Sequence, residues 1–508
     1  MALAPFTLLD PETIGGLIED WSARQPEFGA LLRAGIAPAP ALSRWGLRLL
    51  RANRFDEAGE AFRAVASLTP ADPVAWLNCG LALDRHNRFA EAAACLDRSV
   101  ALSPRQTETW ILLGTVRMKL KDLTAAETAY RVALEQAPSS PLAWQCLGLL
   151  QQDRTDCDGA IESFKRCIKC GGSNPALLAN LGKIYSQSGR FAEALESLTA
   201  AVNAEPDNHR YRQMMRKARF LTEIIAGRAV DEAIAGFQSA SASAPGAWEK
   251  ELQLLLQSAF GLLSQFGHVE AARLVGRRRR ELWPESACAE YLLRALAAEP
   301  GLARSPDRYL IEHFDEFAGA FDQQLVNVLG YDVPEKIGAA VRAATAPGQL
   351  YDALDAGCGT GLCGPHLRHL ARKLVGVDLA AKMLERAAER KLYDALHRAE
   401  IMAYLAGSPG EFDLITAADV LIYIGDLGPL FAAAAVALRR DGLIAVSTER
   451  WAGEGFHLNP SGRFSHSPGY VQAVATPDFA PVAASETTLR LEANLRVPGN
   501  LFVFRRRA

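Results

Sequence analysis

Small and large apolar residues recur at a fixed spacing along the N-terminal half of the chain. Five glycines stand 34 residues apart, an alanine follows each of them twelve residues later, and proline ends four of the five units. Glycine and alanine let two helices pack closely, while large side chains fill the space between neighbouring units. The pattern therefore predicts five helical hairpins, and the recurring positions are Gly46, Gly80, Gly114, Gly148, Gly182, Ala58, Ala92, Ala126, Ala160, Ala194, Pro70, Pro104, Pro138, Pro206, Trp76, Trp110 and Trp144.

Beyond about residue 310 the apolar pattern changes. Strand-like runs such as LYDALDA, KLVGVDLA, FDLITAADV and GLIAVSTE alternate with helix-like runs such as AAKMLERAAERK. This alternation predicts a mostly parallel sheet with helices on both faces. The tail, residues 487–506, predicts two strands joined by a turn near Pro498 and Gly499, which would give the sheet an antiparallel edge.

The segments around these two regions are helical without a clear repeat. Pro26, Pro38 and Pro40 interrupt an N-terminal extension, and residues 299–307, EPGLARSPD, predict a hinge. In RYLIEHFDEFAGAF the phenylalanines share one helix face, which predicts either core packing or a lid over a ligand; they are Phe314, Phe317 and Phe321. The predicted domains are an N-terminal extension, five repeats, a degenerate helical cap and an α/β domain, at residues 1–38, 39–206, 207–300 and 301–508.

One stretch combines a strand, an acid and closely spaced glycines. Tyr351–Gly364 reads YDALDAGCGTGLCG, so a strand ends at Asp355 and a glycine turn leads toward a helix. Glycines permit a tight turn and close approach of a ligand, and free N–H groups of a following helix would face a carboxylate or phosphate. Asp378 ends the next apolar strand, near the spacing expected for a ribose-binding carboxylate.

Composition narrows the class of protein. The 508 residues suggest several domains, and the apolar and charged fractions of 49% and 22% are typical of soluble globular proteins. A net charge of -3 and the absence of an apolar run of ~20 residues favour neither nucleic acid nor membrane as a partner. Nine scattered cysteines and an N-terminus unlike a signal peptide predict a cytoplasmic location.

Two resemblances follow from these motifs. Residues 39–206 resemble the tetratricopeptide repeat, and residues 310–508 resemble class I S-adenosylmethionine-dependent methyltransferases. Bacterial proteins that join the two share an FDxxLxxxLGY segment, here Phe321–Tyr331, and an SGRxxHSxxY segment, here Ser461–Tyr470. The fold class expected is an all-α superhelix followed by a Rossmann-like α/β domain with a terminal hairpin. Such repeats would bind a protein or peptide in their groove, or form a homodimer.

The methyltransferase resemblance also implies a site for S-adenosylmethionine. The glycine turn would line the methionine and ribose end, Asp378 would bind the ribose, and Glu400 would lie near the adenine or be exposed. The end of the fourth strand would lie beside the transferring methyl group. The cofactor-binding residues expected are Asp355, Gly357, Cys358, Gly359, Gly361, Leu362, Asp378, Leu379, Met383, Glu400, Asp419, Val420 and Tyr423.

Candidates for catalysis are few. Arg463, His466 and Tyr470 lie in a loop before the terminal hairpin, where Arg463 could hold an anionic group and His466 could take a proton. An ordinary polar surface loop is the alternative. His366 and His369 lie three residues apart without a third ligand in view, so no metal site is expected.

The expected function is S-adenosylmethionine-dependent methyl transfer to a protein, peptide or small molecule that the repeats recruit or organise. One alternative is an interaction scaffold whose methyltransferase-like domain only binds a ligand. Another is an NAD-dependent oxidoreductase, because Gly359, Gly361 and Gly364 spell GxGxxG. Against it, the turn begins at Gly357 and the acid Asp355 would repel a pyrophosphate.

Overall fold

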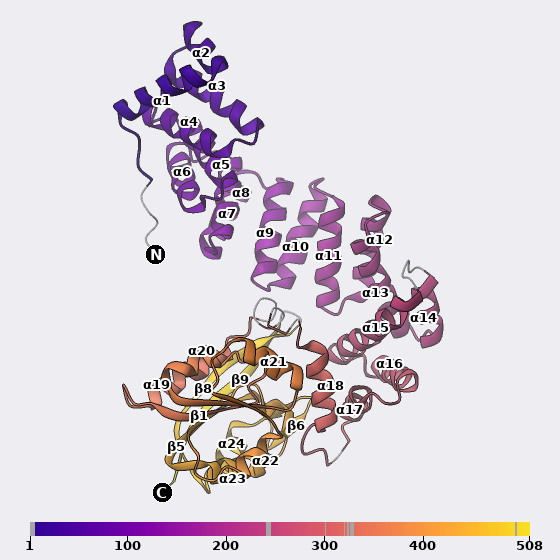
Figure 1. Ribbon diagram of the computed structural model, residues 1–508. Helices are drawn as coiled ribbons and strands as arrows, with labels where there is room; N and C mark the ends of the chain where they lie inside the picture. The colour runs from indigo at the N-terminus through magenta and orange to yellow at the C-terminus, as the bar shows by residue number, and fades with distance from the viewer. Residues whose placement is uncertain are drawn as a thin grey trace. The chain divides into compact units, whose positions relative to one another are not determined.

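The computed structural model describes residues 6–239, 245–299, 301–319, 321–322, 325, 330–492 and 495–507. The chain divides into two compact units, Met1–Tyr185 with Glu196–Tyr211, and Ser186–Leu195 with Arg212–Ala508 (Figure 1). The boundaries of these two units do not coincide with the boundaries of the predicted domains. Within the predicted Phe321–Tyr331 motif, residues 323–324 and 326–329 lie outside the described residues, as does the side chain of Phe317.

The predicted repeats are present as consecutive helix pairs, and two further helices precede them. Pro26 and Pro38 each occupy the first turn of a helix, where proline is tolerated because that N–H has no helical partner, so these prolines start helices rather than interrupt them. The helices are α1 (Pro11–Arg24), α2 (Pro26–Arg33), α3 (Pro38–Arg51), α4 (Phe55–Leu68), α5 (Pro73–Arg85), α6 (Phe89–Leu102), α7 (Thr107–Lys119), α8 (Leu123–Gln136), α9 (Pro141–Asp153), α10 (Cys157–Lys169), α11 (Pro175–Gln187) and α12 (Phe191–Ala204).

Close packing explains the periodic glycines and tryptophans. At four of the five periodic glycines a Cβ atom would lie within 2.8 Å of a large side chain of the second helix, so no larger residue fits without a shift; the pairs are Gly46–Phe62, Gly80–Leu96, Gly114–Tyr130 and Gly148–Phe164. The tryptophan indoles donate hydrogen bonds of 2.8–2.9 Å to the carbonyls of the prolines that end the preceding units, in the pairs Trp76–Pro70, Trp110–Pro104 and Trp144–Pro138.

Between the repeats and the sheet the second unit contains further helices, and all but the last of them share a core around Phe220, Phe237 and Phe260. They are α13 (His209–Ile225), α14 (Val230–Ser239), α15 (Pro245–Gln265), α16 (Val269–Leu282), α17 (Ala287–Leu296) and α18 (Asp307–Phe317).

The segment predicted as a hinge is fastened to the α/β domain. The carbonyl of Ala303 accepts N–H bonds from Gly425 (2.7 Å) and Asp426 (2.9 Å). Ser305 is fully buried; its N–H donates to the carbonyl of Tyr423 (2.8 Å) and its hydroxyl donates to the hydroxyl of Tyr291 (2.9 Å). The backbone of Ala303 and Ser305 is therefore hydrogen-bonded to the segment that follows β4. A hinge would need free backbone, so the hinge prediction is wrong here.

Within the described residues, the α/β domain contains one nine-stranded sheet. Strands β3, β2, β1, β4 and β5 are parallel in that order, β9 is antiparallel to β5, and β8 is antiparallel to β9. This confirms the predicted fold class with its terminal hairpin. The strands are β1 (Tyr351–Ala356), β2 (Ala371–Asp378), β3 (Ala395–Arg398), β4 (Phe412–Ala417), β5 (Leu438–Arg450), β6 (Phe456–Leu458), β7 (Phe464–His466), β8 (Phe479–Glu492) and β9 (Leu495–Arg506).

Helices lie on either side of the sheet (Figure 1), and each face carries its own apolar core. Successive strand residues alternate between them: Ala353 belongs to the core on one face, and Leu354 belongs to the core on the other. The remaining elements are α19 (Val333–Ala344), α20 (Gly364–Leu367), η2 (Arg368–Leu370), α21 (Ala381–Glu389), α22 (Ile401–Ala406), η3 (Leu421–Tyr423), α23 (Gly428–Ala437) and α24 (Pro468–Ala475).

Two local predictions in this domain need correction. Pro498 and Gly499 lie inside β9 rather than in a turn, and the pairing shifts register beside them, between Thr488 and Arg490. That irregularity accommodates a proline, which has no N–H for the ladder. The helix after the glycine turn is only the four residues of α20, too short to present the row of free N–H groups that the sequence suggested.

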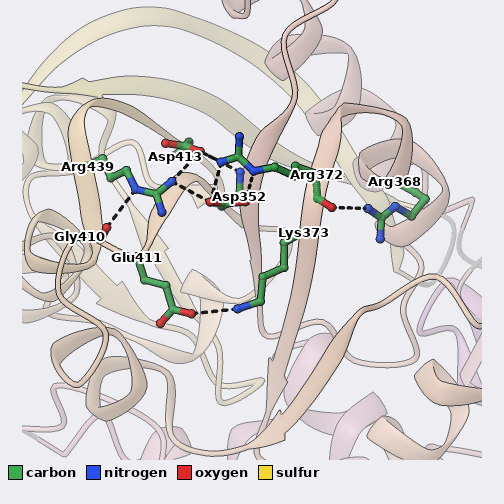
Figure 2. A network of polar contacts seen from close by, with 8 residues as sticks. All are labelled: Asp352, Arg368, Arg372, Lys373, Gly410, Glu411, Asp413 and Arg439. Atoms are coloured by element: carbon green, nitrogen blue, oxygen red, sulfur yellow. Dashed lines mark hydrogen bonds and ion pairs between the residues drawn. The ribbon is translucent and has the colours of Figure 1, made fainter.

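The amino ends of the parallel strands are joined by a network of ion pairs (Figure 2). Arg372 donates to both carboxylate oxygens of Asp352 (2.9 and 2.7 Å), and Arg439 lies 2.9 Å from both Asp352 and Asp413. The N–H of Asp352 donates to Asp413 (2.9 Å). The arginine contacts hold the pKa of Asp352 at about 2. Two acids and two bases therefore tie β1, β2, β4 and β5 together.

Candidate active site

A cavity of about 280 Å³ lies at the opposite, carboxyl ends of these strands. Its walls come from the glycine turn after β1, the ends of β2 and β4, and side chains of the segment from Arg304 to Pro334. In open α/β sheets this is the position at which ligands bind. The cavity is therefore the candidate active site.

The glycine turn wraps closely around the end of β2. Gly357, Gly359 and Gly361 have φ values of 75°, 54° and 84°, a region that favours glycine. The N–H groups of Gly357 and Cys358 donate to the carbonyl of Val377 (2.8 and 3.0 Å). At Gly357 a Cβ atom would lie 2.4 Å from Val420, so a side chain there would collide with the segment that follows β4.

Asp378 joins this turn to the cavity. Its carboxylate accepts N–H bonds from Gly359 (2.9 Å) and Ala380 (2.9 Å), and it borders the cavity. Burial raises the pKa of Asp378, while the two N–H bonds act in the opposite direction. Among the described residues, no arginine or lysine forms an ion pair with it. The carboxylate is thus held by backbone alone and retains acceptor capacity toward the cavity.

Most of the residues predicted to bind the cofactor border this cavity, although they come from four separate parts of the sequence. Those that border it are Gly357, Cys358, Gly359, Leu362, Asp378, Leu379, Met383, Glu400, Asp419, Val420 and Tyr423, together with Arg463. Those that do not border it are Asp355, Gly361, His466 and Tyr470.

Asp355 lies behind the turn. It is 1% exposed, and its carboxylate accepts hydrogen bonds from the hydroxyls of Tyr393 (2.7 Å) and Thr416 (3.3 Å). Burial raises the pKa of Asp355 to about 6. Gly361 belongs to the turn but does not border the cavity, and a Cβ atom there would be 3.0 Å from Tyr393. Both residues shape the turn without bordering the cavity, so the prediction that they contact a ligand is not supported.

His466 and Tyr470 do not line the cavity, and their side chains hold the neighbouring backbone in place. The His466 ring is fully buried, and its Nε2–H donates to the carbonyl of Ile424 (2.8 Å); burial lowers its pKa to about 4. The Tyr470 hydroxyl accepts an N–H from Leu427 (3.0 Å) and donates to Asp426 (3.2 Å). Since neither side chain reaches the cavity, the predicted proton-transfer role of His466 is corrected to a structural one.

A cluster of buried charges borders the cavity beyond Asp419. Arg490, 2% exposed, contacts both carboxylate oxygens of Asp419 at 3.1 Å, and it also pairs with Glu449 and Glu492. Arg463 pairs with Glu492. Asp419 has a φ of 58°, unusual for a residue other than glycine. Arg490 therefore fixes an acid on strained backbone at the edge of the cavity, a role that the sequence did not reveal.

Side chains of α18 cover part of the cavity. Phe314 of α18 and Phe321, which follows the helix, border it and pack against Met383, so the two predicted roles, core packing and cover, are combined. Phe314 also meets Tyr423 edge-on, with ring centroids 5.5 Å apart. His313, the neighbour of Phe314, borders the cavity as well. It was missed because only the phenylalanines of that helix gave a periodic signal.

Asp322, the acid of the FDxxLxxxLGY motif, forms hydrogen bonds with the glycine turn and with Arg390. The carboxylate of Asp322 accepts hydrogen bonds from the Thr360 hydroxyl and from Arg390, and Arg390 also donates to the carbonyl of Thr360 (2.6 Å). Thr360 belongs to the glycine turn and borders the cavity. Asp322 thus attaches the segment bearing Phe321 to the turn.

Two family models match the chain. One, described as a methyltransferase domain, matches residues 354–444, which run from β1 into β5. The other, described as the C-terminal domain of cilia and flagella-associated protein 70, matches residues 30–254 and so spans the repeats. The α/β part of the chain therefore carries a methyltransferase domain, and the N-terminal part carries tetratricopeptide-type repeats.

Curated relatives match only in part. A ubiquinone biosynthesis O-methyltransferase of Albidiferax ferrireducens is 30% identical over 101 residues, which is 19% of this chain and 40% of the relative. An uncharacterized protein of Synechococcus sp. is 35% identical over 100 residues, 18% of this chain and 24% of the relative. The chain thus spans less than half the length of either relative, and neither match identifies an acceptor.

Solved structures resemble each part of the chain separately. MamA shares 21% identity and covers 34% of this chain and 95% of its own, with a TM-score of 0.31. An S-adenosylmethionine-dependent methyltransferase from Mesorhizobium loti shares 23% identity and covers 33% of this chain and 96% of its own, with a TM-score of 0.27.

Two features are absent from the described residues. No helix in the described ranges is long and apolar enough to cross a membrane, and no group of three or more His, Cys, Asp or Glu side chains there could hold a metal ion. The cytoplasmic location stays a prediction.

Proposed function

We propose that the α/β domain transfers a methyl group from S-adenosylmethionine to an acceptor that the repeats recruit or organise. The methyltransferase family match over residues 354–444 supports the reaction class. The relative named as an O-methyltransferase supports it further. When bound, the cofactor would supply an activated methyl group on a sulfonium, and the protein would align the acceptor and exclude water.

The placement of Asp378 carries this proposal. Its carboxylate is fixed by the N–H groups of Gly359 and Ala380 at the cavity edge, with acceptor capacity left over. A pair of ribose hydroxyls needs such an acceptor. Leu379 and Met383 follow Asp378 along the same wall and offer an apolar surface for an adenine ring. Together these residues fit the nucleoside half of S-adenosylmethionine.

The charges around the cavity favour a sulfonium cofactor over a dinucleotide. Each of its arginines already pairs with at least one acid: Arg304 with Asp307 and Glu400, Arg463 with Glu492, and Arg490 with Asp419, Glu449 and Glu492. A pyrophosphate at the glycine turn would meet the carboxylate of Asp378 and no unpaired arginine of this wall. A cationic sulfonium meets no such repulsion.

The repeats provide the proposed link to the acceptor. Stacked helical hairpins bury their apolar faces against one another and leave an extended surface for a protein segment or a second copy of the chain. A scaffold that binds a ligand without turnover remains the competing function. Turnover separates the two, because a scaffold would bind the cofactor and form no methylated product.

Calorimetric titration of the full-length protein with S-adenosylmethionine, S-adenosylhomocysteine and NAD tests the proposal. We expect binding of the first two and none of the third. The full chain is needed because residues 212–508 form one compact unit, so a cut at residue 300 would remove Tyr291, which holds Ser305 and the carbonyl of Gly462. Binding of NAD alone would replace the proposal with the oxidoreductase.

A further inference from the structure

Tyr331, the last residue of the FDxxLxxxLGY segment, brings a hydroxyl group to the cavity. Its side chain is partly buried and borders the cavity. Two other hydroxyl groups of the cavity wall already have partners, because Ser305 donates to Tyr291 and Thr360 donates to Asp322. No described residue forms a hydrogen bond with the Tyr331 hydroxyl, and its oxygen is not enclosed by protein. A buried tyrosine hydroxyl usually has a partner, so this one is a donor available to a ligand.

Tyr331 lies at the end of the cavity formed by β4 and β8. Its ring packs in the core that contains Leu489 of β8, and the next residue, Arg490, borders the cavity and contacts Asp419 after β4. Burial raises the pKa of Tyr331, and the charge of Asp419 acts in the same direction, so the hydroxyl stays protonated. The order of strands is β2, β1, β4, β5, β9 and β8, which separates this end from Asp378 at the end of β2.

The ion pairs at this end leave a place for a further cation. Three acids meet two arginines in one cluster, so acids are in excess; the five residues are Asp419, Glu449, Glu492, Arg463 and Arg490. Asp419 is the acid of this cluster that borders the cavity. Because both arginines are already paired with these acids, an anionic group that binds here needs a neutral donor, and the Tyr331 hydroxyl is such a donor.

S-adenosylmethionine carries a cation and an anion together at its amino acid end, as an ammonium group and a carboxylate. With its nucleoside at Asp378, that end would lie across the glycine turn, toward β4. We propose that Tyr331 is a further cofactor-binding residue, whose hydroxyl donates a hydrogen bond to this carboxylate while Asp419 accepts hydrogen bonds from the ammonium group. The assignment rests on the proposed function. It gives a role to a residue that the sequence did not place among the cofactor-binding ones.

Two ligands that differ at this end test the proposal. S-adenosylhomocysteine carries the amino acid, whereas methylthioadenosine has the same nucleoside and sulfur without it. In calorimetric titrations of the full-length protein, Tyr331→Phe should weaken binding of S-adenosylhomocysteine by about 10- to 100-fold, because a hydrogen bond to a charged group is lost. The same substitution should change the affinity for methylthioadenosine by less than about twofold, because that ligand has no carboxylate.

Matched variants separate this effect from a general one. Asp378→Asn should weaken both ligands by the same factor, since both carry the ribose. Tyr470→Phe should weaken neither, because that side chain does not border the cavity. Decarboxylated S-adenosylhomocysteine keeps the ammonium group, so Asp419→Asn should weaken its binding and Tyr331→Phe should not.

Three outcomes would overturn the inference: an equal loss of affinity for S-adenosylhomocysteine and methylthioadenosine in Tyr331→Phe, an unchanged affinity for S-adenosylhomocysteine in that variant, or an equal loss for the decarboxylated ligand. The first would make Tyr331 a structural residue, and the other two would place its hydroxyl away from the carboxylate. A wild-type protein that binds none of the three ligands would instead overturn the proposed function.

Discussion

The two ends of the same parallel strands are built in opposite ways. At the amino ends, Asp352, Asp413, Arg372 and Arg439 balance one another in a partly exposed network (Figure 2). At the carboxyl ends, charged groups are buried around a cavity, and Asp378 has no basic partner among the described residues. Balanced, solvated charges hold strands together at little cost, whereas buried charges are costly and persist where a ligand uses them.

The largest expected difference is in the free energy of unfolding when an arginine is replaced at one end of the strands or at the other. Arg490→Met leaves the buried acids Asp419, Glu449 and Glu492 without that counter-charge, and should lower the free energy of unfolding of this domain by about 3–5 kcal/mol. Arg372→Met is the matched control. The Arg372 side chain is 58% exposed and Asp352 keeps Arg439, so the cost should be about 0–1 kcal/mol. Equal losses in urea denaturation would refute the contrast.

The two ends should also respond to different pH ranges. Burial lowers the pKa of His466 to about 4, so its contribution to stability is lost as the pH falls from about 6.5 toward 4. Asp355, with a pKa raised to about 6 by burial, acts in the opposite direction over part of this range and offsets it in part. At the amino ends, Asp352 contributes its stabilisation above about pH 4 and loses it only toward pH 2.

Thermal unfolding followed from pH 7 to pH 4 measures this effect. We expect His466→Gln to be less stable than the wild type at pH 7 and to lose less stability on acidification, by about 1–3 kcal/mol. Asp352→Asn should not change the slope between pH 6.5 and pH 4. A slope that disappears in Asp352→Asn would assign the acid sensitivity to the wrong end of the strands.

The contrast also explains what the sequence could reveal. The repeats and the glycine turn were predictable because their signals are local: a 34-residue period, and a strand, an acid and glycines in one stretch. Asp378 was predicted in the same way, from its distance along the chain to the turn, and it borders the cavity. These elements depend on neighbours in sequence, and the structure contains them.

Contacts between distant residues left no such signal. Arg490 meets Asp419 across 71 positions of sequence, and nothing near Arg490 indicates a buried ion cluster. His466 was chosen because histidine carries protons, but residue type does not reveal that this ring is fully buried. The predicted hinge contains proline and glycine, yet Ser305 is held by Tyr291 and by the carbonyl of Tyr423, which only the folded chain brings together.

In the proposed function, the carboxyl ends of the strands bind the nucleoside of the cofactor through Asp378. Calorimetric titration of S-adenosylhomocysteine into full-length Asp378→Asn and Asp352→Asn tests it most directly. We predict that Asp378→Asn weakens binding by about 1–3 kcal/mol, because a charged hydrogen-bond acceptor is lost, and that Asp352→Asn binds as the wild type does. Unchanged affinity in Asp378→Asn, or an equal loss in both variants, would contradict the account.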